Sequence, residues 1–262
     1  MSEAAPYPTT SVWMTPQDSM RLGAGEAHVW LVATDDPHFE SNHALLSPSE
    51  QERAAKFKFA IHRRRYVAAH GALRQILSRY LEVAAASLEF IEGAQGKPRL
   101  VQPPERVALQ FNLSHSHEAA LIAVALERHV GVDIEYIKPA FDWEGIVENF
   151  FAPGEIAQLK TLPAQLQGPA FFTCWTRKES YIKAKGGGLS IPLRDFEVSV
   201  DPSKPAALLS CASDAREVRH WAMVNLDAGS EYKATICIEA PLDSLKCWRW
   251  NVGPNWITRR NA

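Results

Sequence analysis

The expected strands and helices occur in the same order twice along the chain, and this repeat constrains the fold more than any other feature. Its clearest markers are two strand-then-turn pairs, Leu88–Glu92 before Gly96–Pro98 and Asp195–Val200 before Ser203–Pro205. Asn112 and Asn225 also each precede an apolar strand. A duplicated strand–helix–strand–strand unit explains the repeat, with chance similarity as the alternative. Two such units would pack as an intramolecular pseudo-dimer with the ligand site in the cleft between them.

Two long segments have the composition and spacing of helices. The first spans about residues 49–81, as one helix or as two, with Gly71 as its weak point. The second spans about residues 170–185 and ends at the glycines 186–188. Short apolar runs predict strands at His28–Thr34, Leu88–Ile91, Ala119–Leu126, Val130–Ile137, Phe196–Val200, Trp221–Leu226 and Lys233–Glu239.

Two of these strands, 119–126 and 130–137, are separated by only a few polar residues. We expect them to be neighbours joined as a hairpin. The whole pattern predicts an α+β fold of two similar α/β units, each with a long helix on a small antiparallel sheet. We place the units at residues 26–128 and 129–262, after a flexible N-terminal arm of residues 1–25.

Composition argues against several classes of protein. The chain is 46% hydrophobic and 22% charged, with a formal net charge of −2, so it has no general attraction for nucleic acid or an anionic membrane. It shows neither a signal peptide nor an apolar run long enough for a membrane span. The cysteines are scattered without a CxxC pair, which favours free thiols in a reducing cytoplasm: Cys174, Cys211, Cys237 and Cys247.

An acidic pair marks the strand that opens the second unit. Along Gly131–Ile137, alternation places Asp133 and Glu135 side by side on one face, because side chains of a strand point to opposite faces in turn. Two adjacent carboxylates repel each other, and a hard dication with oxygen ligands relieves that repulsion. A solvated strand face is the simpler alternative, and from this pair alone it is the favoured one.

A second acidic residue lies on the helix expected at 170–185. Trp175, Glu179 and Lys183 recur every four residues, so they share one stripe of that helix. Glu179 and Lys183 could form only a surface ion pair. The tryptophan in the stripe indicates instead that this side faces protein, which favours a partly buried site.

These residues resemble two signature motifs of the phosphopantetheinyl transferases. The motifs are Gly131-Val-Asp-Ile-Glu135 and the longer Trp175-x-x-Lys-Glu-Ser-x-x-Lys-x-x-Gly-x-Gly-Leu189. Three further stretches resemble the family in the same order: Gly96–Pro98, Phe111–Ser116, and Phe150-Phe151 with Glu155. Length and duplication resemble the larger, monomeric, pseudo-dimeric (Sfp-type) class. The resemblance covers about residues 47–192, and the last part of the chain is similar only in general pattern.

The resemblance implies transfer of the phosphopantetheine arm of coenzyme A to a serine of an apo acyl or peptidyl carrier protein, releasing 3′,5′-ADP. It implies that Asp133, Glu135 and Glu179 bind Mg²⁺ or Mn²⁺, with Glu179 also as general base. Lys183 would assist the leaving group. The implied coenzyme A contacts are Arg53, Arg65, Lys97, Ser114, His115 and Lys183. The carrier would dock transiently near Phe150–Glu155 and the helix at 170–185.

Several alternatives stay open at this point. Glu50 departs from the family, since some relatives have a basic residue there near the 3′-phosphate. The histidines 115, 117 and 129 could bind zinc, but their spacing is not typical of zinc sites. A basic cluster at residues 56–65 suits nucleic acid, coenzyme A phosphates or an acidic carrier helix, and a solvated helix face is the simpler alternative for most of its residues. An unrelated coenzyme A-dependent acyltransferase or a non-catalytic binding module are the rival functions.

Overall fold

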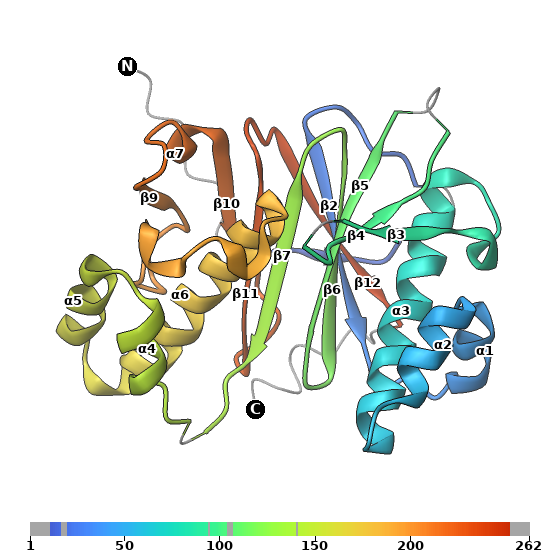
Figure 1. Cartoon of the computed structure of the whole chain (residues 1–262), viewed down its shortest axis with the longest axis horizontal. Helices are drawn as coiled ribbons and strands as arrows, with labels where there is room; N and C mark the ends of the chain where they lie inside the picture. The colour runs from blue at the N-terminus through green and yellow to red at the C-terminus, as the bar shows by residue number, and fades with distance from the viewer. Residues whose placement is uncertain (1–10, 17–19, 94, 104–106, 140, 252–262) are drawn as a thin grey trace.

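The repeat expected from the sequence is the basis of the fold (Figure 1). The computed structural model describes residues 11–16, 20–93, 95–103, 107–139 and 141–251. The first unit contains β2 (Glu26–Ala33), α1 (Phe39–Leu45), α2 (Pro48–Ala55), α3 (Ala60–Leu81), β3 (Phe90–Glu92), β4 (Pro98–Leu100), β5 (Leu109–Ser116) and β6 (Ala119–Leu126). The second contains β7 (Val130–Tyr136), α4 (Glu144–Phe150), α5 (Pro153–Thr161), α6 (Ala164–Lys185), β8 (Phe196–Val198), β9 (Leu208–Cys211), α7 (Glu217–His220), β10 (Trp221–Asn225) and β11 (Tyr232–Glu239).

Matching strands take matching places in the two main sheets. The first sheet has the order β1-β12-β2-β6-β5, and the second has the order β10-β11-β7. In each unit the last strand lies between the first strand and the one before it, with antiparallel pairing on both sides. Each unit also has a two-stranded ribbon, β3-β4 or β8-β9, after its long helix. The prediction of two similar α+β units in a pseudo-dimer is therefore confirmed.

The two ends of the chain meet in the first sheet. Strand β12 (Ser244–Trp250), expected within the second unit, crosses back and pairs in parallel with β2. Strand β1 (Trp13–Met14) pairs with β12 in turn, and the Trp13 side chain is buried. This part of the expected flexible arm is thus held in the sheet, whereas residues 1–10 and 17–19 lie outside the described residues. The division at residues 128 and 129 stays a prediction.

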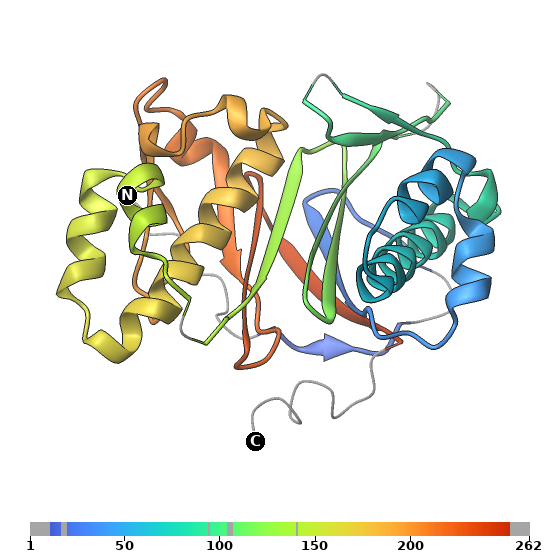
Figure 2. The ribbon, with the colours of Figure 1, turned by 60° about the horizontal axis from the view of Figure 1, so that its bottom comes forward.

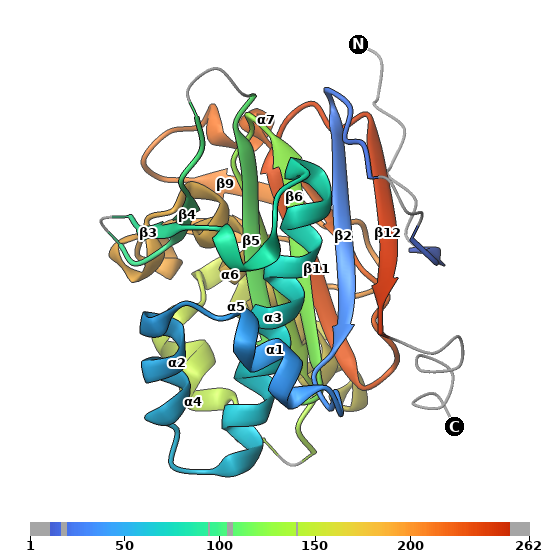
Figure 3. The ribbon, with the colours of Figure 1, turned by 90° about the vertical axis from the view of Figure 1, so that its right-hand side faces the viewer.

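The two sheets are enclosed between the long helices, with α3 on one side and α6 on the other (Figures 1 and 2). Alternate residues of β2 explain the layering, because Val29 and Leu31 enter a core shared by both sheets while Trp30 and Val32 pack toward α3. Figure 3 shows α1, α2 and α3 in front of the first sheet. Strand β2 is therefore buried along its whole length, and from Val29 to Ala33 it is a continuous apolar run rather than an alternating one.

The hairpin expected between residues 119–126 and 130–137 is wrong. Strand β6 pairs with β2 and β5, whereas β7 pairs with β11 in the other sheet. On the edge of β7 that faces β5, side chains of β5 rather than a strand ladder accept from the backbone: Asn112 accepts from Val132 N–H. Because these hydrogen bonds occupy that edge, the two sheets meet at a seam instead of merging.

The helical segment predicted at residues 49–81 consists of two helices, α2 and α3, which was one of the two alternatives expected from the sequence. Helix α2 begins with a capping box, in which Ser47 and Glu50 each accept a hydrogen bond from the other's backbone N–H. The break falls at residues 56–59, and Gly71 lies inside α3, where a Cβ would meet Asn42 at 2.7 Å. Helix α6 ends at Gly186, which has a φ of 72°, as predicted. None of the helices in the described part of the chain is long and apolar enough to cross a bilayer.

Candidate active site

Helix α6 crosses β7 closely because Gly131 has no side chain. A Cβ at this position would lie 2.1 Å from the carbonyl oxygen of Ser180 and 2.3 Å from the backbone nitrogen of Ala184. Both are backbone atoms, which cannot rotate away. The glycine of the first signature motif therefore sets the distance between the strand with Asp133 and the helix with Lys183.

At this crossing, Asp133 and Glu135 contact side chains from two other elements, α6 and β5. Lys183 Nζ lies 2.5 Å from Asp133 Oδ1, across from α6 to β7. Ser114 Oγ of β5 donates to the same oxygen at 2.8 Å, and Ser116 Oγ donates to Glu135 Oε2 at 2.9 Å. The surface ion pair between Glu179 and Lys183 is thus not the arrangement found. Lys183 reaches the strand instead.

Electrostatics place the third carboxylate with the other two. Burial, followed by repulsion from Asp133, raises the pKa of Glu179 to about 7. The same two causes raise the pKa of Glu135. Burial also raises the pKa of Asp133, against the effect of Lys183, and Asp133 Oδ2 is buried with no hydrogen-bond partner. The three carboxylates are thus coupled electrostatically, and the charge of Lys183 opposes the rise in each of their pKa values.

The carboxylate oxygens of this site are of the kind that bind a hard dication, although the three side chains do not point to one common position. Within the described residues, no group of three or more His, Cys, Asp or Glu side chains stands close enough together to hold a metal ion. That also applies to the zinc alternative at His115, His117 and His129. Three carboxylates with raised pKa values and one orphaned oxygen nevertheless match the oxygen ligands that Mg²⁺ takes.

A pocket of about 380 Å³ opens beside the seam on the first unit, between α2, α3 and the β3-β4 ribbon. Its cationic lining comes from Arg53, His70 and Arg74. Glu50 lies in the same wall, where its carboxylate is 2.7 Å from Arg74 Nη2 and 3.4 Å from His70 Nδ1. Glu50 therefore engages His70 and Arg74, and the predicted coenzyme A contact of Arg53 stays a prediction.

Positive groups also surround His115. Strand alternation turns its imidazole to the α3 side, away from Ser114 at the seam. The pKa of His115 is lowered to about 4, chiefly because the surrounding protein removes water from the charged ring. Smaller contributions come from the positive charges of His70, Lys183, Arg53 and Arg65. The cations of the two units thus converge near His115. Ser114 and His115, both predicted to contact coenzyme A, thus lie on opposite faces of β5, and their coenzyme A contacts stay a prediction.

Lys97 is engaged within the protein. Its Nζ donates to the backbone carbonyls of Val130, Lys183 and Ala184 at 2.9, 2.6 and 3.3 Å. Burial lowers the pKa of this amine to about 8. These bonds join the β3-β4 turn of the first unit to β7 and α6 of the second. The structure therefore gives Lys97 a joining role, and its nucleotide contact stays a prediction.

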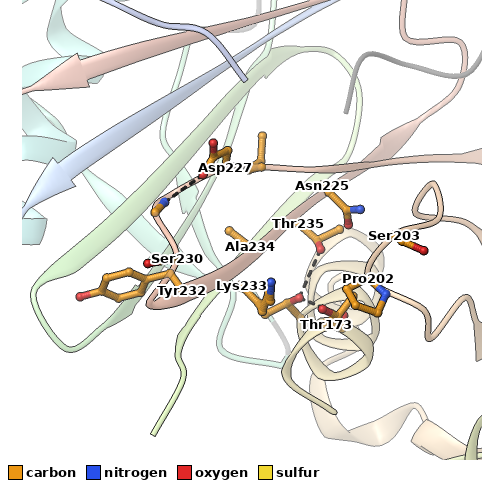
Figure 4. A pocket seen from close by; sticks show the side chains of 13 residues that line it. Thr173, Pro202, Ser203, Asn225, Asp227, Ser230, Tyr232, Lys233, Ala234 and Thr235 are labelled. Atoms are coloured by element: carbon orange, nitrogen blue, oxygen red, sulfur yellow. Dashed lines mark hydrogen bonds between the residues drawn. The ribbon is translucent and has the colours of Figure 1, made fainter. Parts of the chain in front are cut away.

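A larger pocket, of about 530 Å³, lies on the second unit between α6, β10 and β11 (Figure 4). Hydroxyl groups dominate its lining, and Thr176 and Thr235 bond to each other across it at 3.2 Å. Lys233 is the single basic residue among its lining residues, and Asp227 brings an opposing charge. The smaller pocket has three basic lining residues, together with Glu50, Glu89 and Glu92, so volume alone does not identify the site.

Other motif residues build the framework of the second unit. Lys178 is fully buried and 2.7 Å from Glu155 Oε1, and it also donates to the carbonyls of Leu193 and Phe196. Glu155 in turn accepts from backbone N–H groups on either side of that contact. Of the stretch expected to meet a carrier, Phe150 is exposed and lies edge-on to Trp175, whereas Glu155 faces inward.

Sequence reasoning missed Ser116, His70 and Arg74. The run at 111–116 was treated only as a segment ahead of a strand, yet it is itself strand β5. Read as a strand, its polar residues at every second position would have placed Asn112, Ser114 and Ser116 on one face.

Comparison with known proteins gives a consistent family. The model described as the 4′-phosphopantetheinyl transferase superfamily matches residues 129–237, and the one described as 4′-phosphopantetheinyl transferase, N-terminal, matches residues 31–128. The chain is 35% identical over 240 residues to 4′-phosphopantetheinyl transferase HetI of Nostoc sp., covering 91% of this chain and 98% of that protein. It is 34% identical to 4′-phosphopantetheinyl transferase psf-1 of Bacillus pumilus, over 69% of this chain and 76% of that protein.

A third relative, 4′-phosphopantetheinyl transferase Sfp of Bacillus subtilis, is 27% identical over 76% of this chain and 84% of its own length. The two family models together cover both structural units, as the larger class requires. The chain therefore belongs to the 4′-phosphopantetheinyl transferase superfamily, in its larger, Sfp-type class.

Proposed function

We propose that the site at the seam transfers the phosphopantetheine arm of coenzyme A to a carrier-protein serine, using Mg²⁺ held by Asp133, Glu135 and Glu179. The serine oxygen forms a bond to the β-phosphorus while the bond from that phosphorus to 3′,5′-ADP breaks. The observation that carries the proposal is the contact of Lys183 with Asp133 at the crossing of β7 and α6, where the charge of Asp133 also acts on Glu135 and Glu179. The family assignment supports the reaction, and this contact supports a location at the seam.

The metal's role follows from the charge of the site. When bound, Mg²⁺ supplies positive charge to the phosphate oxygens and relieves the repulsion among the carboxylates. Asp133 Oδ2 offers it a buried oxygen with no other partner. Mn²⁺ suits the same oxygen ligands.

Glu179 and Lys183 move the protons. With its pKa raised to about 7, Glu179 falls in the range where a carboxylate can take a proton from a serine hydroxyl at neutral pH. Lys183 stays charged because Asp133 raises its pKa against the effect of burial. That charge would stabilise the oxygen of the departing 3′,5′-ADP or give it a proton.

Coenzyme A would bind across the seam. The 3′-phosphate would lie among Arg53, Arg65 and His115, where the positive charges of both arginines act on the imidazole. Arg65 is 3.7 Å from Glu118 Oε1, and a phosphate would compete with that carboxylate for it. The nucleotide would occupy the pocket of about 380 Å³ on the first unit. The carrier protein would dock transiently beside Phe150. We further propose that the enzyme works as a cytoplasmic monomer without nucleic-acid or membrane partners.

A chromatographic assay of 3′,5′-ADP release, with coenzyme A and an apo carrier protein present, tests this proposal. The wild-type protein should require Mg²⁺ or Mn²⁺, and Asp133→Ala and Glu179→Gln should abolish release while retaining the fold. Lys233→Met, in the other pocket, serves as the matched control and should keep full activity. Metal-independent release, or normal release by either acidic variant, would refute the site. Coenzyme A binding without release would favour a non-catalytic module.

A further inference from the structure

Three polar side chains of β5 bond in sequence to the backbone of β7 along the seam. Asn112 Oδ1 accepts from Val132 N–H at 2.8 Å. Two residues further along each strand, Ser114 Oγ accepts from Ile134 N–H at 3.4 Å, and next Ser116 Oγ accepts from Tyr136 N–H at 3.0 Å. We call Asn112, Ser114 and Ser116 the β5 ladder. It holds the edge of one unit to the edge of the other.

The two serines of the ladder also contact the acidic residues, which lie between the amides they bind. A hydroxyl has one proton to donate and lone pairs to accept with. Because Ser116 Oγ accepts from Tyr136 N–H, its proton is free for Glu135 Oε2, 2.9 Å away. Ser114 does the same for Asp133 Oδ1 at 2.8 Å. The backbone amide thus fixes the serine oxygen, and the serine fixes the carboxylate.

We propose that Ser116 is a positioning residue that orients Glu135 for the metal, with Ser114 acting in the same way on Asp133. This rests on the proposed metal site. The seam between the two units is then part of the active site, since a residue of the first unit sets the direction of a ligand carried by the second. Asn112 makes the same kind of backbone bond with no carboxylate in contact, so the chain contains its own control.

Ser116 is the better of the two serines for a test. Ser114 also accepts from Lys183 Nζ at 3.1 Å and was predicted to contact coenzyme A, so its loss would disturb several functions. Ser116 hydrogen-bonds to Tyr136 N–H and to Glu135. Partners of metal-binding carboxylates typically change metal affinity by about 10- to 100-fold when they are removed.

The experiment measures Mn²⁺ alone binding to the full chain, from the paramagnetic resonance signal of free Mn²⁺, together with the unfolding midpoint. Ser116→Ala should weaken Mn²⁺ binding by about tenfold or more. Ser116→Thr keeps the hydroxyl and should bind within about twofold of wild type. Asn112→Ala should lower the unfolding midpoint yet bind Mn²⁺ within about twofold of wild type.

The possible results distinguish a failure of the Ser116 positioning role from a failure of the proposed metal site. Wild-type affinity in Ser116→Ala would overturn the positioning role and leave the metal site standing. Equal losses in Ser116→Thr or Asn112→Ala would also overturn it, because a loosened seam alone would then explain the effect. If wild-type protein binds no Mn²⁺, or Glu135→Gln binds it as tightly, the metal site and the positioning role fall together.

Discussion

Replacing Gly131 with alanine tests whether the close crossing of β7 and α6 sets the geometry of the site. The new Cβ would lie 2.1 Å from Ser180 O and 2.3 Å from Ala184 N. Strand and helix must separate by about 1 Å to restore ordinary contact. Overpacking of this kind costs on the order of 3 kcal/mol, which for a chain of this size lowers the unfolding midpoint by roughly 6 to 12 °C.

The same displacement moves Lys183 relative to Asp133. In the wild-type protein, Lys183 Nζ is 2.5 Å from Asp133 Oδ1. A shift of about 1 Å in a reacting arrangement can cost about 100-fold in rate. Transfer kinetics well below the unfolding midpoint should show this loss. Gly145→Ala in α4 is the control, because no atom lies within 4 Å of its Cβ position. A Gly131→Ala variant with lowered stability but a wild-type rate would refute the reasoning.

Three other predictions concern charged groups around the site. Burial would raise the pKa of Glu50, but hydrogen bonds from His70, Ser47 N–H and Arg74 lower it to about 2. Glu50→Gln should therefore lower the free energy of unfolding by up to about 3 kcal/mol at pH 7. In urea unfolding, the difference in stability from wild type should shrink below about pH 4.5 and vanish near pH 2. A bound phosphate should raise the low pKa of His115, so coenzyme A binding near pH 5.5 should take up a proton. Calorimetry in two buffers should detect the uptake, which His115→Asn should remove. Lys97→Met should lower the unfolding midpoint and change coenzyme A affinity by less than about twofold; a selective loss of affinity would support a nucleotide contact instead.

The sequence was most informative where local chemistry decides structure. The end of α6 at Gly186 follows from the left-handed backbone that glycine adopts easily. The start of α2 was equally visible, since Ser47 and Glu50 have the spacing of a capping box. The repeat was also legible, because two copies of one unit preserve the order of elements even where their residues differ.

Long-range pairing was less predictable. Nothing near Glu127 indicates that β7 leaves the first sheet, since that depends on side chains of β5 occupying its edge. Nor does the sequence around Ser244–Trp250 show that β12 pairs with β2, across more than 200 residues. For the site, residue types predicted the acidic cluster, whereas the internal bonds of Lys97 depend on the packing of both units.

The central claim is that this chain modifies a carrier-protein serine with a metal-dependent site at the seam. Intact mass spectrometry of an apo acyl or peptidyl carrier, incubated with the protein, coenzyme A and Mg²⁺, tests it most directly. We expect a mass gain of one phosphopantetheine unit, which chelation or Asp133→Ala removes. A gain that persists with chelator and in Asp133→Ala, or no gain on any of several unrelated carriers, would contradict it.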